Sequence, residues 1–341
     1  MLKLSFMQKD KVYFLKDFNR LDQALDLLLK DFYPKNSSLS VKIHFGEPGN
    51  KAAFTTKDIK PITDFLKKES LNFYLMDTPV VYPSPRNTVQ GYLLITKLKG
   101  FDKLGKCLIS DQYKKIKTKD FEAEVSLELI SADCSLVISH VKGHSCSGFG
   151  GAIKNLGMGG VSKKTKNIEH TLCKPILDKD KCTSCKKCEQ VCPAKAIKIK
   201  DKYPEIDLEK CYGCSICEDN CPSKSLTPQQ IIFDDLLAQA ASVVINHLPK
   251  KTFYINFLKN IVENCDCSMK AGKTLCPDLG ILFSKNPVAI DKASVDLINQ
   301  FSKKNLFQER FNKDPLLHLK YTSEYSNFSL DYELEDLSNN F

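Results

Sequence analysis

The sequence predicts an α/β fold, with a mainly parallel sheet, flanking helices and a small cysteine-rich insert. Strand-like and helix-like runs alternate through residues 1–143, which is the pattern of parallel strands joined by crossover helices. The same pattern resumes after residue 229. Between the two, residues 174–228 are rich in lysine and cysteine and contain two proline-terminated cysteine motifs.

In the first half of the chain, apolar periodicity separates strands from helices. Residues 20–32 carry apolar side chains at helical spacing, and residues 135–143 are apolar and β-branched, as in a buried strand. We expect Pro61 to break or to start the second helix. The expected strands are residues 11–17, 40–46, 72–77, 107–111 and 135–143, and the expected helices are residues 20–32, 55–68, 88–101 and 126–132.

The second half of the chain shows the same alternation after the insert. Residues 241–247 and 278–284 are expected to be strands, and residues 286–301 a helix with Pro287 near its start. Residues 252–264 mix strand and helix signals. The tail that follows is polar and aromatic, and no chemistry can be assigned to it.

Polar side chains follow several of the predicted strands. His44, Asp77, Asp111 and His144 fall at or just after strand ends. In open parallel sheets, ligands bind beyond the carboxyl ends of the strands. The sequence therefore predicts a ligand site at that edge of the sheet.

Composition and cysteine content indicate the cellular setting. The chain has 341 residues, 42% of them hydrophobic, and no run of eighteen apolar residues, so we expect a globular protein without a membrane span. Residues 1–14 lack an apolar core and a small-residue cleavage site, so we expect no signal peptide and a cytoplasmic location. In that reducing compartment, fifteen cysteines indicate metal or redox chemistry rather than disulfides.

The formal net charge of +9 arises from lysines spread along the chain, with one local run at residues 163–166. No helix-turn-helix, zinc-finger or RNA-binding signature accompanies them. A solvated surface is therefore the simpler interpretation, and we do not expect nucleic acid or a membrane as a partner.

The insert carries the strongest chemical signal in the sequence. Residues 182–193 and 211–222 both read C-x2-C-x2-C-x3-C-P, and each cysteine repeats 29 positions later. Bacterial two-cluster ferredoxins have this spacing; three cysteines of a run hold one [4Fe-4S] cluster and the fourth reaches the other. Zinc is the alternative, but a zinc site takes four ligands and two complete runs fit clusters better. The expected ligands are Cys182, Cys185, Cys188 and Cys221 for cluster 1, and Cys211, Cys214, Cys217 and Cys192 for cluster 2.

These signals predict a domain organisation. We expect one discontinuous α/β domain, residues 1–173 and 229–341, and an inserted α+β ferredoxin-type domain, residues 174–228. Residues 196–208 would supply the insert with a strand, a turn and a second strand. Two independent domains in series are the alternative. Two clusters in one small module would let electrons pass through it, which predicts electron transfer with a redox partner protein.

A glycine-rich segment, residues 140–160, holds seven of the fifteen glycines and overlaps the end of a predicted strand. It is not a dinucleotide fingerprint, because Ile153 stands at the third glycine position, and not a Walker loop, because Phe149 replaces lysine. Two interpretations stay open. The segment is either a tight turn that packs backbone against backbone, or a pocket wall whose amides, with Lys142 and Lys154, bind an acidic group.

Seven cysteines lie outside the two motifs. Cys107 and Cys134 sit in apolar runs and are expected in the core. Four others could assemble a third metal or redox site together with His144, and free thiols lining a pocket are the alternative. The candidates for this extra site are Cys146, Cys265, Cys267 and Cys276.

Taken together, these segments resemble the domain-of-unknown-function 362 family, whose members are often described as uncharacterised iron–sulfur centre proteins. The resemblance covers nearly the whole chain and implies the α/β architecture and the clusters, but no substrate. The chain differs from the family pattern at Ser145, Cys146 and Cys276. The similar motifs are VKIHFGEPGN (41–50), DTPVVYPSPRNT (77–88), the glycine-rich segment, NCDC (264–267) and PDLGILFSKNPVAID (277–291).

The leading functional hypothesis is a redox protein, in activity an oxidoreductase, whose insert exchanges electrons with a pocket in the α/β part. Lysines and glycine amides would hold a small anionic substrate there, and a histidine would move protons. One alternative is an electron carrier that docks a redox partner without a reaction of its own; another is a cluster-based sensor or nucleic-acid binder. The pocket candidates are Lys42, His44, Asp77, Lys142, His144, Lys154, Asn155 and His170.

Overall fold

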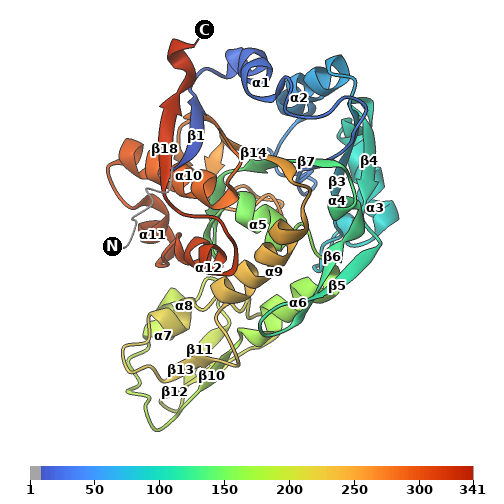
Figure 1. Ribbon diagram of the computed structural model, residues 1–341. Helices are drawn as coiled ribbons and strands as arrows, with labels where there is room; N and C mark the ends of the chain where they lie inside the picture. The colour runs from blue at the N-terminus through green and yellow to red at the C-terminus, as the bar shows by residue number, and fades with distance from the viewer. Residues whose placement is uncertain (1–8, 341) are drawn as a thin grey trace, which may run out of the picture.

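The computed structural model describes residues 9–340 and is built around one eight-stranded sheet (Figure 1). Seven strands run in the same direction and one opposes its two neighbours, so the sheet is mainly parallel, as the sequence predicts. In spatial order the strands are β18 (Tyr332–Asp336), β1 (Asp10–Leu15), β17 (Gly280–Ser284), β14 (Lys251–Leu258), β7 (Cys134–His140), β2 (Ser38–Lys42), β3 (Asn72–Asp77) and β4 (Lys106–Ile109), with β17 the antiparallel strand.

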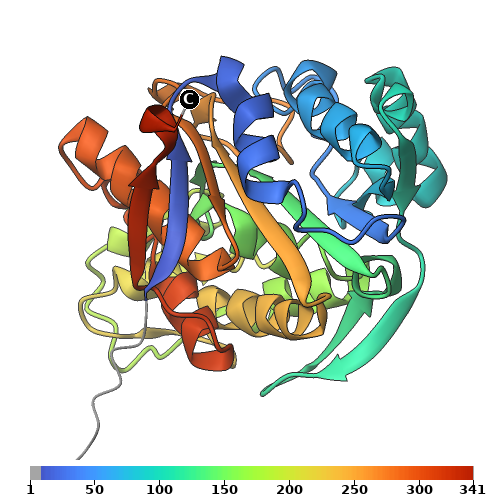
Figure 2. The same ribbon diagram turned by 45° about the horizontal axis from the view of Figure 1, so that its top comes forward.

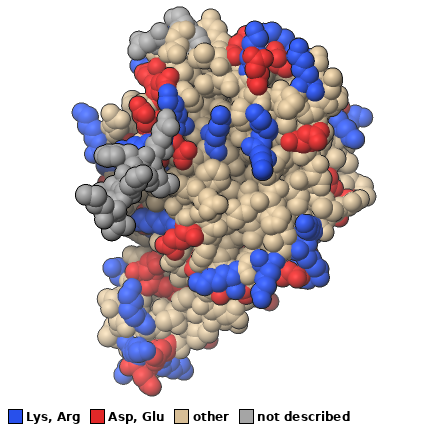
Figure 3. Space-filling model, viewed as in Figure 1, with Lys and Arg blue, Asp and Glu red and all other residues tan. Residues whose placement is uncertain are grey.

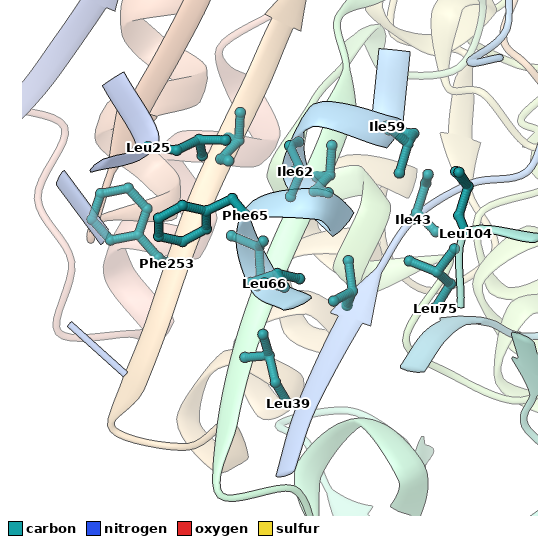
Figure 4. Packing of buried hydrophobic residues seen from close by; sticks show 14 of the residues in the cluster. Leu25, Leu39, Ile43, Ile59, Ile62, Phe65, Leu66, Leu75, Leu104 and Phe253 are labelled. Carbon is teal, nitrogen blue, oxygen red and sulfur yellow. The ribbon is translucent and has the colours of Figure 1, made fainter. Parts of the chain in front are cut away.

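Helices cover both faces of this sheet (Figure 2). Alternate residues of each strand face opposite sides: on β7, Leu136 and Ile138 belong to one core and Val137 to the other. Figure 4 shows part of the first core, where side chains of the second helix pack onto the sheet. The helices of the first core are α1 (Leu21–Leu29), α2 (Thr56–Lys68) and α3 (Val89–Leu98), and those of the second are α4 (Leu127–Ile130), α5 (Ala152–Gly157), α9 (Phe233–His247), α10 (Pro287–Ser302), α11 (Leu306–Phe311) and α12 (Leu317–Tyr325).

Short hairpins and one further helix surround the carboxyl edge of the sheet. The glycine-rich segment forms one of these hairpins and then continues into α5. The hairpins pair β5 (Tyr113–Lys117) with β6 (Glu122–Ser126), β8 (Lys142–His144) with β9 (Gly148–Gly150), and β15 (Ile261–Val262) with β16 (Thr274–Cys276), and the helix is α6 (Lys163–Leu172).

The cysteine-rich segment forms a separate lobe at the lower end of Figure 1. Its two halves repeat the order strand, helix, strand; its first strand pairs with its last, and the two middle strands pair with each other. The pairing of the first and last strands brings the two ends of the segment together where it joins the rest of the chain. The elements are β10 (Pro175–Leu177), α7 (Lys187–Val191), β11 (Ile197–Lys200), β12 (Tyr203–Ile206), α8 (Ile216–Asp219) and β13 (Leu226–Pro228).

The expectation of a strand at residues 241–247 is wrong, because these residues form the second half of α9. Gly157 of α5 lies so close to α9 that a Cβ there would meet the Leu237 carbonyl oxygen at 2.8 Å. Tertiary packing of this kind overrides the strand preference of β-branched residues.

Pro61 neither breaks nor starts the second helix, in contrast to the expectation. The helix begins at Thr56, where the Thr55 amide donates to Asp58 Oδ2 at 2.8 Å, and it continues through the proline. A proline at this position cannot donate to the Lys57 carbonyl; Lys57 is an exposed residue, so water can bond that carbonyl instead.

The surface shown in Figure 3 mixes basic and acidic side chains, and few charges lie at its centre. Among the helices described, none has both the length and the apolar character needed to cross a membrane. The expectation about a signal peptide rests partly on residues 1–8, which lie outside the described residues.

Candidate functional site

A cavity of about 1040 Å³ opens at the carboxyl edge of the sheet, between the sheet and the cysteine-rich lobe. It lies beside β2, which has β3 on one side and β7 on the other. The chain adds strands first on one side of β2 and later on the other, and open α/β sheets bind ligands at such a switch point in strand order. Asp111 is exposed and takes no part in the lining, which corrects one of the four strand-end expectations. The pocket candidates that line the cavity are His44, Asp77, Lys142, His144, Lys154, Asn155 and His170.

The eighth candidate, Lys42, lies beneath this lining in a buried ion pair. Its ammonium is 2.9 Å from Asp77 Oδ1 and donates to Asn155 Oδ1 at 2.7 Å. The Tyr92 hydroxyl donates to the other oxygen of Asp77. Burial by itself would raise the pKa of Asp77, but the charge of Lys42 and smaller effects of neighbouring groups, among them the bond from Tyr92, together outweigh burial, and the pKa falls to about 2. The pair is therefore ionised and fixes the position of Asn155 on α5.

A second buried ion pair holds His44. The Arg86 guanidinium donates to Glu47 Oε2 through Nε (2.8 Å) and Nη2 (2.6 Å), and its Nη1 lies 3.0 Å from His44 Nε2. Burial and then the charge of Arg86 lower the pKa of His44 to about 3, so this ring is neutral at physiological pH. Arg86 and Glu47 were not predicted as pocket residues. The only signal for them in the sequence was their place in the family-like motifs.

Asp266 anchors the loop that carries Cys265 and Cys267. Its carboxylate lies 2.9 Å from His140 Nδ1 and 3.0 Å from the Lys142 ammonium, and all of Asp266 is buried. Burial opposes its ionisation, but the charges of His140 and Lys142 outweigh burial and hold the pKa well below its usual range. These contacts fix both neighbouring cysteines against the cavity.

His144, Cys265 and Cys267 lie close together. Their ligand atoms are all within 4.8 Å of one another, which is close enough to hold one metal ion, and no other group of three such side chains within residues 9–340 is this compact. Two other candidates for the extra site lie elsewhere. Cys146 lines the cavity but packs with Cys173, and Cys276 lies in the core at β16.

The charge around these thiols comes mainly from Lys154. Within the described residues its ammonium makes no hydrogen bond or ion pair, and its charge acts on Cys265 and Cys267. A second lysine, Lys166, is buried on α6, where burial lowers its pKa to about 7. Burial also raises the pKa of the neighbouring Glu169 well above its usual range, which favours its neutral form. The cavity therefore has the positive charges of Lys154 and Lys166 on this wall, with Asp77 as the neighbouring carboxylate of Lys166.

The opposite wall belongs to the cysteine-rich lobe, which contributes Cys192 and Cys211 to the lining. His170 of α6 connects the two walls, because its Nδ1 donates to the Tyr212 carbonyl at 2.9 Å. Burial lowers the pKa of His170 to about 4, so the ring is neutral. The lobe docks closely here, since a Cβ at Gly213 would lie 2.5 Å from Cys173 Sγ.

The two cysteine runs adopt the same backbone shape. Left-handed residues recur at the 29-residue spacing: Ser184 (φ 56°) corresponds to Gly213 (φ 61°), and Lys186 (φ 61°) to Ser215 (φ 60°). Such residues wind the backbone so that side chains and amides of one loop converge. The Gly213 amide donates to Cys211 Sγ at 3.4 Å.

The fourth cysteine of the first run lies with the second run. Burial, then Glu218, then the neighbouring thiols Cys214, Cys211 and Cys192 raise the pKa of Cys217, which indicates that Cys192 is near these residues. Cys221 and Cys188 lie in one small apolar cluster, which also includes Cys192 and Cys217.

A buried lysine from the C-terminal tail supports this lobe. Lys313 donates to the Cys214 carbonyl at 2.7 Å and pairs with Asp234 at 2.5 Å, and all three residues are buried. No sequence signal pointed to this lysine, because the tail is polar and Lys313 looks like a surface lysine in sequence; only the fold buries it.

The fold and cavity define an open α/β protein with a cysteine-rich lobe beside its ligand edge. The family described as "Domain of unknown function (DUF362)" matches residues 40–296, and the chain belongs to this family. No curated protein matches it in sequence.

Two solved structures are distantly similar. One is a crystal structure of a Thermotoga maritima protein, with a TM-score of 0.43 and 9% identity over 90% of this chain and 59% of that chain. The other is the lactate racemase apoprotein from Thermoanaerobacterium thermosaccharolyticum, with a TM-score of 0.38 and 13% identity over 74% of this chain and 51% of that chain. The chain thus spans little more than half the length of either protein.

Proposed function

We propose that the protein is an iron–sulfur oxidoreductase. Its cysteine-rich lobe would be a ferredoxin-type domain, residues 174–228, inserted into one α/β domain. Cys182, Cys185, Cys188 and Cys221 would hold one [4Fe-4S] cluster, and Cys211, Cys214, Cys217 and Cys192 the other. When bound, clusters of this kind supply one-electron transfer.

The shape of the lobe fits two clusters better than zinc. Tetrahedral zinc with bonds of about 2.3 Å brings its sulfur ligands to about 3.8 Å from one another. No three of the eight motif thiols, all within the described residues, come within 4.8 Å of one another. The repeated left-handed turns and the amide donated to Cys211 also suit cubane clusters, which accept hydrogen bonds on their sulfurs.

The observation that carries the proposal is the shared cavity. Cys192 and Cys211 line one wall, and the lysines and histidines of the α/β part line the other. Lys154 and Lys166 suit a small anionic substrate. Cys185 is the one exposed thiol of the eight, so the other end of the lobe is accessible to a redox partner protein.

A non-catalytic electron carrier is the second candidate function, and the exposure of Cys185 favours it equally. The large cavity lined by charged side chains favours an enzyme, because a carrier needs no such space. Nucleic-acid binding has less support, since acidic side chains lie among the basic ones on the face shown in Figure 3.

Electron paramagnetic resonance of the anaerobically reduced protein tests the coupling between lobe and cavity. We expect His170→Ala to shift the signal or potential of one cluster, because His170 bonds to the residue after Cys211. His247→Ala is the matched control, since His247 also bonds a backbone carbonyl through Nδ1 but lies at the exposed end of α9. Equal spectra for both variants, with full iron content, would contradict the proposed role of the cavity.

A further inference from the structure

The Cys265–Cys267 pair has a geometry that no cluster requires. The two cysteines flank Asp266 in a tight turn, closed by a hydrogen bond from the Ser268 amide to the Cys265 carbonyl at 2.9 Å. The Cys267 amide also donates to Cys265 Sγ at 3.3 Å. Both residues line the cavity, and neither belongs to the ferredoxin-like runs.

The hydrogen bonds of His144 determine which ring nitrogen carries its proton. Nδ1 accepts from the amides of Cys146 (3.1 Å) and Ser147 (3.3 Å), so the neutral ring is protonated at Nε2. The histidine therefore acts as a donor to the Cys265 sulfur. A metal ion at Nε2 would need the proton on Nδ1, where it would point at two amide hydrogens. This arrangement favours a thiol–imidazole pair over a metal site.

The sulfur of Cys265 accepts several hydrogen bonds. Hydrogen bonds from the Cys267 thiol, and then the charge of Lys154 and the bond from His144, hold the pKa of Cys265 well below its usual range despite burial. The hydrogen bond that the Cys267 thiol donates to Cys265 also raises the pKa of Cys267 well above its usual range. A thiolate that accepts from a neighbouring thiol is the reactive form of a dithiol.

We propose that Cys265 and Cys267 form a redox-active dithiol that reduces small anionic disulfides in the cavity. Its anionic preference follows from Lys154, the cation beside both sulfurs, whose ammonium forms no ion pair with a carboxylate of the described residues. The space of about 1040 Å³ admits a peptide-sized ligand.

The reaction balances through two exchanges. The Cys265 thiolate attacks one substrate sulfur, breaks the substrate S–S bond and releases one substrate thiolate, which takes the proton of Cys267. The Cys267 thiolate then attacks Cys265 Sγ, breaks the mixed disulfide and releases the second thiolate, which is protonated by water. The substrate gains two electrons and the dithiol becomes an intramolecular disulfide, which an external dithiol can reduce.

The chain offers a convenient reporter for this chemistry. Trypsin cleaves after Lys259 and Lys270, and the peptide between them, residues 260–270, contains Cys265 and Cys267 as its only cysteines. We would equilibrate the cluster-loaded protein anaerobically with mixtures of reduced and oxidised glutathione, alkylate the free thiols and identify this peptide by mass spectrometry.

We expect a doubly alkylated peptide in reducing mixtures and an internal disulfide in oxidising ones, with a two-electron transition between them. Cys267→Ser should instead accumulate glutathione on Cys265, and Cys276→Ser should behave as the unaltered protein. His144→Gln should move the pH dependence of Cys265 alkylation to higher pH, because the change removes a donor that stabilises the thiolate.

Two results would overturn the proposal. One is a peptide that stays doubly alkylated across all mixtures. The other is a peptide protected from alkylation until a chelator removes a stoichiometric metal, which would make the group a metal site. Neither outcome depends on the clusters, because the iron content of the same sample reports on the proposed iron–sulfur function separately.

Discussion

Replacing Asp266 by asparagine should destabilise the protein strongly. The change keeps the shape of the side chain but removes the charge that His140 (2.9 Å) and Lys142 (3.0 Å) share. Removal of one partner from a buried ion pair costs about 3–5 kcal/mol, because the remaining charge stays buried. Asparagine keeps one acceptor oxygen, so we expect a loss near the lower end, about 3 kcal/mol.

The effect should depend on pH in a defined direction. The pKa of Asp266 lies well below its usual range in the folded protein. Its stabilisation is therefore complete above the unfolded value of about 3.9 and is lost as pH falls through the folded pKa. The deficit of the Asp266→Asn variant should stay constant between about pH 5 and 8 and shrink below about pH 4.

Urea unfolding followed by circular dichroism under anaerobic conditions measures this loss. With a slope of about 3 kcal/mol per molar urea, the midpoint should fall by about 1 M. The matched control is Asp64→Asn, which removes the exposed ion pair with Lys60 and should shift the midpoint by less than about 0.2 M. Equal midpoints for the two variants would refute the view that Asp266 anchors the cysteine loop.

Three further changes test other parts of the site. Gly213→Ala places a Cβ 2.5 Å from Cys173 Sγ at a left-handed residue, so it should lower the free energy of unfolding by about 2–3 kcal/mol. Both the melting temperature and the iron content should fall, and an unchanged melting curve would argue against close docking of the lobe. Since the pKa of Lys166 is about 7, calorimetry should show weaker binding of the probe anion sulfate at pH 8 than at pH 6, and Lys166→Gln should abolish the difference. If the variant keeps the same pH dependence, Lys166 is not the group that binds the anion. Asp291→Ala removes the carboxylate that accepts from the first two amides of α5, those of Ala152 (2.7 Å) and Ile153 (2.9 Å). The free energy of unfolding in urea should fall by about 2 kcal/mol, and a loss below about 0.5 kcal/mol would contradict this capping role.

The sequence predicted most of the fold, because its strands and helices differ in apolar period. The parallel sheet, the flanking helices and the hairpin within residues 196–208 are all present. The error at residues 241–247 has a physical cause: β-branched residues favour strands when isolated, but here they extend a helix already begun at Phe233. The conformational preference of single residues does not show that residues 241–247 continue the helix α9, which packs against α5.

The candidate site was predictable where chemistry follows strand ends. Seven of the eight pocket candidates line one cavity. His44 and Asp77 lie there because parallel strands have their carboxyl ends at the same edge, whereas Lys154, Asn155 and His170 lie on the helices α5 and α6. Arg86 and Lys313 were missed, since a buried ion pair has no local signature. Cys276 was included because other cysteines lie nearby in the sequence, and Asp111 because it ends a predicted strand. In the structure β16 places Cys276 in the core, and Asp111 is exposed.

The most direct test of the central claim is the iron and acid-labile sulfide content of the anaerobically purified protein. Two [4Fe-4S] clusters on the eight motif cysteines require about eight iron and eight sulfide per chain, with no stoichiometric zinc. Stoichiometric zinc with little iron, or about four iron per chain after full reconstitution, would contradict the two-cluster lobe and the electron transfer built on it.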